Sequence, residues 1–296
     1  MKKRVQAVLA VWMALTMTIG LMVSASAAGL VDTVKERNNI SSKQQRSISE
    51  VRNADDIILV AHRGLGTEAP ENTIPAFELA AQKGFQYVET DIHTTKDGVW
   101  VISHDSNLKR MTGYDGEIRN MTLREVQSHP VIHGSNADRY PGLVTPTLED
   151  FLRTCQEKDL NPVIEIKVWG LKEPYQKILS LLDQYGLKER AIIISFYTQP
   201  LALIRQLDES VREQYLSNTM SRRVVLNAAL LQNCGIDVLG YTMMLRPLET
   251  KTAKALGIET NAWTIDNPAI ASMMIMLDLP QYLTTNTLMP NQNQAA

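Results

Sequence analysis

Short apolar segments alternate with amphipathic segments along residues 55–288, and this alternation restricts the fold more than any other feature. The apolar segments have the character of buried strands, and the segments between them have apolar residues at helical spacing. Strand–helix alternation indicates a parallel sheet with right-handed crossovers. Eight such units over about 234 residues fit a (β/α)8 barrel, whose usual size is about 250 residues. A doubly wound open sheet is the alternative.

Element boundaries follow from the apolar periodicity and from the turn residues. We expect strands at 57–61, 85–94, 162–167, 191–196, 214–217, 238–241, 259–265 and 282–285. Helices are expected at 73–83, 146–158, 174–185, 201–207, 222–232, 249–256 and 268–277. A further strand at 99–103 forms a hairpin arm with the second strand. Residues 107–145 have little periodicity apart from 123–126, which predicts a long loop.

Three acidic residues lie at the ends of predicted strands. Glu89 and Asp91 are two residues apart, so they project from the same face of their strand, and Glu165 lies near the end of the next one. The carboxyl ends of barrel strands meet at one mouth. Carboxylates packed closely there need protonation or a cation, and an all-oxygen site prefers Ca2+ or Mg2+. An ion-pair network with Arg63 and Lys167 is the other explanation for these acids.

The hairpin arm is expected to bring a histidine next to these acids. Asp97-Gly98 between two β-rich segments predicts a two-residue hairpin loop. Facing positions would then sum to 195, which places His104 opposite Asp91. We expect His93 to lie beyond the end of the sheet and to point away from the acids, without a role.

The charged and aromatic residues near these acids suggest phosphoryl chemistry. His62 and His104 come from different segments and could flank a reacting group as general base and general acid. Arg63 and Lys167 would hold an anion, which together with a metal suits a phosphate ester. Trp263 lies near the end of a late strand, where it is either a core residue or a wall for the substrate.

The first residues have the pattern of an export signal. Residues 1–4 are basic, residues 5–23 are almost wholly apolar, and residues 24–28 are small, so we predict a signal peptide at 1–27 and an extracytoplasmic protein. An uncleaved membrane anchor is the alternative. Residues 28–54 form a polar tether, 55–290 the catalytic domain, and 291–296 a polar tail. We expect no stable membrane span once the leader is removed.

Charge and cysteine content narrow the classes of partner. Loss of the leader moves the formal net charge from −2 to −5, with 27 basic side chains against 32 acidic ones. Such a protein has no electrostatic footprint for nucleic acid. Only Cys155 and Cys234 are present; a disulfide is permitted outside the cytoplasm, and two buried free thiols are the alternative. Protein partners cannot be named from the sequence.

An ordered set of short motifs spans residues 57–285. They are His62-Arg63-Gly64, Pro70-Glu71-Asn72-Thr73, Glu89-Thr90-Asp91, Thr95-Lys96-Asp97-Gly98, His104-Asp105, Pro146-Thr147-Leu148-Glu149, Glu165-Ile166-Lys167 and Trp263-Thr264. Each dipeptide alone is weak evidence, but the ordered set is specific. The chain resembles the glycerophosphodiester phosphodiesterase family, in a secreted bacterial form.

This resemblance implies a TIM barrel that hydrolyses a glycerophosphodiester to an alcohol and sn-glycerol 3-phosphate. It implies one divalent cation, held by Glu89, Asp91 and Glu165, and an acid–base pair of His62 and His104. We hypothesise that the glycerol hydroxyl of the substrate attacks phosphorus first, and that water then opens the resulting cyclic phosphate.

The resemblance also assigns residues around the substrate. Arg63 and Lys167 would contact phosphate, and Glu71 and Asn72 would support the site, with Glu71 near the metal. From its place near a strand end, we expect Trp263 to contact the substrate as well. The last strand departs from the family pattern, because it ends in Thr285-Asn286 where the family usually has an aspartate.

Two other functions are compatible with the same motifs. A related barrel phospholipase would act on phospholipids or lysophospholipids and would need an apolar rim on the long loop. The candidates for that rim are Met111, Met121, Val131, Ile132 and Leu143. A catalytically inactive barrel would only bind polyol phosphates, but the presence of both histidines and all three acids argues against it.

Overall fold

The computed structural model describes residues 57–170, 173–231 and 234–290. The predicted signal peptide, the polar tether at 28–54 and the polar tail at 291–296 lie outside these described residues. No helix in the described ranges has the length and apolar character needed to cross a membrane. Both cysteines are free and buried, as one of the two sequence hypotheses proposed.

Eight parallel strands close into a barrel, which confirms the predicted fold. They are β1 (Ile58–Ala61), β2 (Tyr87–Thr94), β4 (Asn161–Ile166), β5 (Ile192–Ser195), β6 (Arg212–Ser217), β7 (Gly235–Leu239), β8 (Thr260–Trp263) and β9 (Tyr282–Thr285). The barrel closes because β1 pairs in parallel with both β9 and β2. The doubly wound alternative is wrong, since an open sheet would leave β1 and β9 without this contact.

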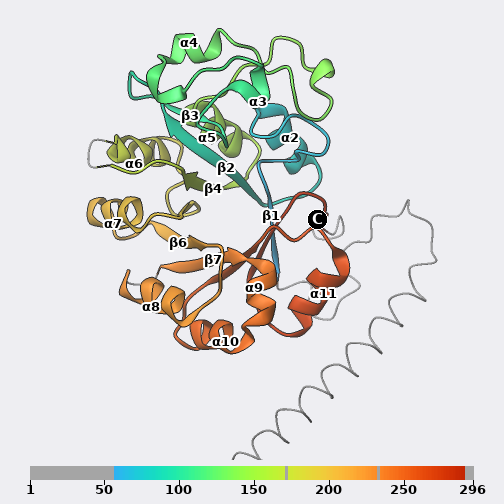
Figure 1. Cartoon of the computed structure of the whole chain (residues 1–296), viewed down its shortest axis with the longest axis vertical. Coiled ribbons are helices and arrows are strands. Elements are labelled where there is room, and N and C mark those ends of the chain that lie inside the picture. The colour runs from blue at the N-terminus through green and yellow to red at the C-terminus, as the bar shows by residue number, and fades with distance from the viewer. Residues whose placement is uncertain (1–56, 171–172, 232–233, 291–296) are drawn as a thin grey trace, which may run out of the picture. The chain divides into compact units, whose positions relative to one another are not determined.

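Helices surround the strands (Figure 1). They are α2 (Ile74–Gln82), α5 (Leu148–Glu157), α6 (Tyr175–Gln184), α7 (Thr198–Leu207), α8 (Arg222–Leu230), α9 (Gly240–Leu245), α10 (Pro247–Ala255) and α11 (Pro268–Met276). Local signals begin several of them: Thr147 and Asp150 form a capping box at α5, and Pro268 occupies the first turn of α11. The large core lies between these helices and the outer faces of the strands.

One predicted boundary is wrong around β7. We expected a strand at 238–241, whereas β7 covers Gly235–Leu239 and the chain then forms the short helix α9. A brief apolar run does not distinguish strand from helix by its periodicity. The pairing of β7 with β6 and β8 decides where the strand begins.

The hairpin register also differs from the prediction. β3 (Trp100–Ile102) pairs antiparallel with β2, and Thr94 faces Trp100, so facing positions sum to 194 and not 195. The turn holds three residues between Thr95 and Val99. The Thr95 N–H donates to the Val99 carbonyl at 2.9 Å. Gly98, at φ +73°, supplies the left-handed residue that three-residue loops use. His104 is therefore not opposite Asp91, whose carbonyl accepts from the Ser103 N–H at 2.9 Å instead.

His93 lies within the sheet, contrary to the prediction. It faces Val101 across the β2–β3 pair and is buried. β2 extends to Thr94, as expected, and pairs with β3 along its last residues, which places His93 inside the sheet.

Residues 107–145 form a folded insertion rather than an irregular loop. It contains α3 (Lys109–Thr112), η3 (Ile118–Asn120), α4 (Leu123–Gln127) and η4 (Ala137–Arg139), and it lies beyond the β2–β3 arm in Figure 1. The expected segment at 123–126 is confirmed as α4. A small apolar cluster around Ile118 and Val126 holds the insertion against Val101 of β3.

Gly64 sets the path of the loop that follows β1. Its φ is +76°, and a Cβ there would lie 2.7 Å from the backbone carbon of Ala76 on α2. We expect Gly64→Ala to cost about 1–2 kcal/mol for the left-handed backbone and about 1–3 kcal/mol more for the overlap. Gly84→Ala is the matched control, because Gly84 has φ +87° with nothing within 4 Å of the added carbon. Denaturant unfolding of both variants measures the difference, and equal losses of stability would contradict the packing argument.

Candidate active site

Strand register brings the three predicted acids together. Glu89 and Asp91 lie on β2 and Glu165 on β4, and Asp91 faces Glu165 in the parallel pairing of these strands. All three are buried, and one carboxylate oxygen from each lies within 4.8 Å of the others. Residues two apart on β2 share a face, which brings Glu89 and Asp91 together. The register between β2 and β4 then places Glu165 beside Asp91, which completes the cluster.

Two cationic side chains, Arg63 and Lys167, form ion pairs with the acid cluster. The Arg63 Nε lies 3.3 Å from Asp91 Oδ2, and the Arg63 backbone N–H donates to Glu89 Oε2 at 2.9 Å. Lys167 Nζ lies 3.3 Å from Asp91 Oδ1 and 3.0 Å from Glu165 Oε1. The ion pairs that the sequence offered as one explanation are therefore present, with Asp91 at their centre.

Burial and charge separate the pKa values of the three acids. Burial first, and the neighbouring Asp91 second, raise the pKa of Glu165 to about 8. The same two causes raise the pKa of Glu89 well above its ordinary value. Burial also acts to raise the pKa of Asp91, but the charges of Lys167 and Arg63 outweigh it and lower that pKa to about 2. Of the three acids, Asp91 is the one whose pKa the protein's own charges lower.

The donor set fits a hard divalent cation. When all three carboxylates are ionised, they and the two cationic side chains, Arg63 and Lys167, have a net charge of −1. Oxygen donors in this number suit Ca2+ or Mg2+. A divalent ion would allow Glu89 and Glu165 to ionise and would leave one net positive charge at the mouth, which could then accept a monoanionic ligand.

The two predicted supporting residues occupy different places. Asn72 Nδ2 donates to Asp91 Oδ2 at 2.8 Å, and its Oδ1 accepts from the Thr90 hydroxyl at 2.8 Å, so Asn72 orients Asp91. Glu71 is outside the acid cluster. Its Oε1 accepts from Arg63 Nη1 at 3.0 Å and from Arg110 Nη2 at 2.6 Å.

His62 lies at the end of β1 and is held by the end of β9. Its Nδ1 lies 2.9 Å from Asn286 Oδ1, while Asn286 Nδ2 donates to Asp266 Oδ2 at 2.8 Å. Because Asp266 orients the amide, the Asn286 oxygen faces the ring, so Nδ1 carries the proton and Nε2 is the free acceptor. Burial first, and the charge of Arg63 second, lower the pKa of His62, which keeps the ring neutral at pH 7.

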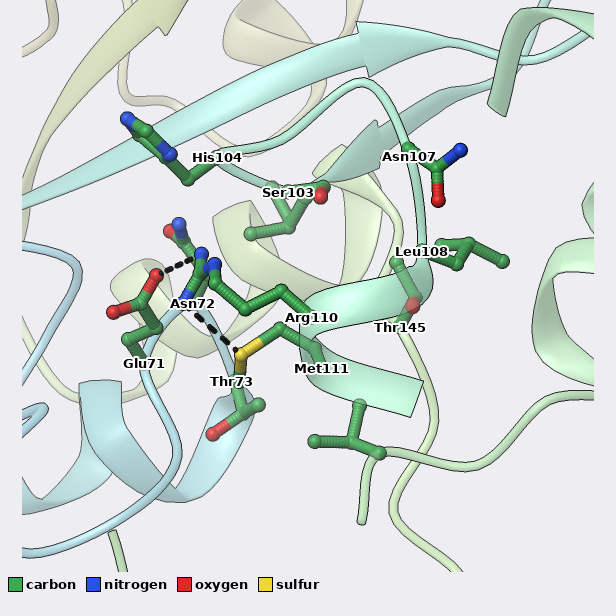
Figure 2. Close-up of a pocket in the computed structure, with 12 residues that line it drawn as sticks. Glu71, Asn72, Thr73, Ser103, His104, Asn107, Leu108, Arg110, Met111 and Thr145 are labelled. Carbon is green, nitrogen blue, oxygen red and sulfur yellow. Dashed lines mark hydrogen bonds and ion pairs between the residues drawn. The ribbon is translucent and has the colours of Figure 1, made fainter. Parts of the chain in front are cut away.

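His104 is held by the insertion. Its Nδ1 lies 2.8 Å from Asp105 Oδ1, and Asp105 Oδ2 accepts from Arg110 Nε. Figure 2 shows Arg110 reaching from α3 toward Glu71 in a hollow that His104 also lines. The backbone carbonyl of His104 accepts from His93 Nε2 at 3.3 Å. His104 is therefore fixed through its ring and through its backbone.

Trp263 ends β8 and is half-buried. Its ring packs edge to face against Phe196 with centroids 5.6 Å apart, and its Nε1 donates to the Asp237 carbonyl at 3.4 Å. Trp263 packs against the apolar cluster inside the barrel. The prediction that Trp263 is a core residue is therefore confirmed for the buried part of the ring.

A model of the Glycerophosphoryl diester phosphodiesterase family matches residues 62–281. The chain belongs to this family. It is similar to a glycerophosphodiester phosphodiesterase of Caldanaerobacter subterraneus subsp. tengcongensis, with 28% identity over 77% of this chain and 93% of that protein. A probable glycerophosphodiester phosphodiesterase 2 of Mycobacterium tuberculosis is 27% identical over 77% of this chain and 86% of that protein. Family membership makes this chain a phosphoric diester hydrolase.

Solved structures share the fold of this family member. A phosphodiesterase of Oleispira antarctica, in complex with the product sn-glycerol-3-phosphate, has a TM-score of 0.70 at 24% identity and covers 81% of this chain and 96% of that chain. A glycerophosphodiester phosphodiesterase of Agrobacterium tumefaciens has a TM-score of 0.68 at 24% identity, covering 78% of this chain and 96% of that chain.

Sequence reasoning missed three residues that position the histidines in this phosphodiesterase. Asn286 was noted only as a departure from the family pattern, yet its amide contacts His62. Asp266 and Arg110 act one step farther out, on Asn286 and on Asp105. Asn286 directly follows the last strand, and that position was a usable signal; Asp266 and Arg110 lie on loops whose path the sequence does not specify.

The Asn286 contact predicts a change in the pKa of His62. The Asn286 oxygen accepts a hydrogen bond that favours the charged ring, so it acts to raise this pKa. We expect Asn286→Leu to lower the pKa of His62 further, because burial and Arg63 still lower it while one of the groups that raise it is lost. Histidine NMR titration of the native chain and the variant measures it. An unchanged or higher pKa would show that the Asn286 contact does not set the ring's protonation.

Proposed function

We propose that this chain hydrolyses glycerophosphodiesters to an alcohol and sn-glycerol 3-phosphate, with one divalent cation, Ca2+ or Mg2+, and with His62 and His104 as the acid–base pair. The observation that carries the proposal is the convergence of Glu89, Asp91 and Glu165 within 4.8 Å at the barrel mouth. Family membership supports the reaction class.

Glu89, Asp91 and Glu165 would hold the cation, which when bound supplies positive charge to the phosphoryl oxygens. Arg63 and Lys167 would contact the phosphate, because each already has a charged group at the cluster. Trp263 would contact the substrate beside them. Asn72 keeps Asp91 oriented, and Glu71 keeps Arg63 and Arg110 in place.

His62 is the better candidate for the base, since its lowered pKa leaves Nε2 free to accept a proton. In the first step the glycerol hydroxyl attacks phosphorus and gives its proton to His62. The bond from phosphorus to the other alcohol breaks, and His104 protonates the departing oxygen. In the second step water opens the cyclic phosphate with the two histidines in reversed roles, which restores both.

We also propose that the chain is exported by residues 1–27, as the basic, apolar and small-residue pattern indicates. N-terminal sequencing of the mature protein tests this, and a start at residue 1 would contradict cleavage.

The phospholipase alternative receives no support from the insertion. Of the five apolar residues that could form its rim, Met121 and Val131 are buried, Met111 and Leu143 are partly buried, and Ile132 is 55% exposed. Met121 packs within the apolar cluster of the insertion and is not available as part of a rim.

The acid cluster predicts that activity depends on a divalent ion. Release of sn-glycerol 3-phosphate from glycerophosphocholine and glycerophosphoglycerol should require Ca2+ or Mg2+ and stop with chelator. Asp91→Asn should lower kcat/KM by roughly 100-fold or more, because it removes the one acid that both Arg63 and Lys167 contact. Calorimetry should show weaker ion binding by the same variant. Phosphorus NMR of the reaction follows the cyclic phosphate, and full activity in chelator would contradict the metal assignment.

His104 predicts a separate loss. We expect His104→Ala to lower kcat by about 10²–10⁴-fold, the usual contribution of a general acid or base, while calorimetric ion binding stays unchanged. His133→Ala is the matched control, because His133 is an exposed histidine on the insertion. Normal turnover by His104→Ala would remove His104 from the acid–base pair.

A further inference from the structure

The outward sides of the consecutive helices α8, α9 and α10 carry large apolar side chains that face water. α10 packs against both α8 and α9, so these outward sides adjoin one another in the lower part of Figure 1. We name this surface the leucine face. Each of its apolar residues is between 53% and 78% exposed, and they are Leu226, Leu230, Tyr241, Leu245, Leu248 and Leu256.

Helical spacing places these leucines away from the core. Arg222, Leu226 and Leu230 follow one another at intervals of four along α8, so they share one side of the helix, while the other side is buried. Leu248 and Leu256 lie eight residues apart, in the first turn of α10 and directly after its last residue. A surface helix ordinarily presents polar residues to water.

The amount of apolar surface on the leucine face points to a binding role. Soluble monomers rarely expose large contiguous apolar patches, and those that occur commonly mark contacts with proteins or membranes. None of the six side chains belongs to the buried core between helices and strands. Their apolar character therefore does not serve the folding of the barrel.

Positive charge accompanies the leucine face. Residues 222–256 hold five basic side chains and two acidic ones, whereas the whole chain holds 30 and 32. Of the two acids, Asp237 is buried, and Glu249 Oε1 lies 3.9 Å from Arg246 Nη1. Four of the five basic side chains are exposed, and they are Arg222, Arg223, Arg246 and Lys251. The leucine face is thus a basic surface on a chain whose net charge is negative.

We propose that the leucine face docks the chain onto the surface of an anionic lipid bilayer. The leucines would enter the headgroup region, and the four basic side chains would contact lipid phosphates. Interfacial contacts of this kind combine an apolar helix side with lysines and arginines, and their strength grows with the buried apolar area and with the negative charge of the lipid. Vesicle binding does not depend on turnover, so its result is independent of the reaction proposed above.

The charges of the leucine face disfavour a second copy of the chain as its occupant. In a two-fold dimer the same surface meets itself, so Arg222 and Arg223 would approach the basic side chains of the other copy. Like charges brought together at an interface oppose binding. An anionic bilayer instead supplies the opposite charge to every basic side chain of the face.

Vesicle flotation of the exported chain tests the role of charge. Vesicles of phosphatidylglycerol with phosphatidylcholine are compared with vesicles of phosphatidylcholine alone. We expect the native chain to bind the anionic vesicles at least about 10-fold more tightly, because each basic side chain near such a surface contributes about 5-fold. Arg222→Gln combined with Arg223→Gln should weaken only the anionic binding, by about 5- to 30-fold. Arg124→Gln, an exposed arginine on α4, is the matched control and should bind as the native chain does.

A second pair of substitutions tests the apolar part. Leu245→Ser combined with Leu248→Ser should weaken binding to both kinds of vesicle by about 10- to 100-fold, because two exposed leucines no longer enter the bilayer. Both side chains are mostly in water, so denaturant unfolding should match that of the native chain. Ile132→Ser is the matched control, since Ile132 is exposed on the insertion, at the opposite end of Figure 1.

Three results would overturn the proposal. The native chain fails to bind anionic vesicles, or the double leucine variant binds them as tightly as the native chain does. The third comes from analytical ultracentrifugation without lipid. A native dimer that becomes a monomer in the double leucine variant would assign the leucine face to a second copy of the chain. The expected result is a native monomer whose binding to anionic vesicles is weakened by both pairs of substitutions and by neither control.

Discussion

Asp91 is the residue on which the rest of the site depends. It is 1% exposed, and Arg63, Lys167 and Asn72 all contact its carboxylate. A buried carboxylate is stable only with compensating charge and hydrogen bonds, so the β1–α2 loop, β2 and the end of β4 must all be in place for Asp91 to ionise. Its charge then raises the pKa of Glu89 and Glu165 and makes the mouth a site that a cation would complete.

Each histidine is oriented by an outer pair of polar residues. Asp266 fixes Asn286, which fixes the Nδ1 proton of His62, and Arg110 fixes Asp105, which accepts from Nδ1 of His104. In both rings Nε2 is left for the proton transfer that we propose. An amide beside His62 favours a neutral base more than a carboxylate would, because a carboxylate would stabilise the charged ring. The Asn286 departure from the family pattern therefore has a chemical consequence.

The acid cluster could be predicted from the sequence because it depends on short-range rules. Glu89 and Asp91 share a face through the period of two, and Glu165 follows from the alternation that places β4 beside β2. The position of His104 was harder to predict, because it depends on a turn that is three residues long rather than two. A single additional residue in the loop moved the expected partner of Asp91 from His104 to Ser103.

The sequence by itself determined the barrel, the three acids and the two histidines, because strand periodicity, strand–helix alternation and motif order are all local properties of the chain. Only the tertiary structure decided which polar groups orient those histidines and which aromatic rings meet at the mouth. Asn286, Asp266 and Arg110 act on residues that are up to 224 positions away in the chain, and the Trp263 ring at the end of β8 meets Phe196 just after β5. Such contacts depend on the closure of the barrel and the paths of its loops, which no local pattern specifies.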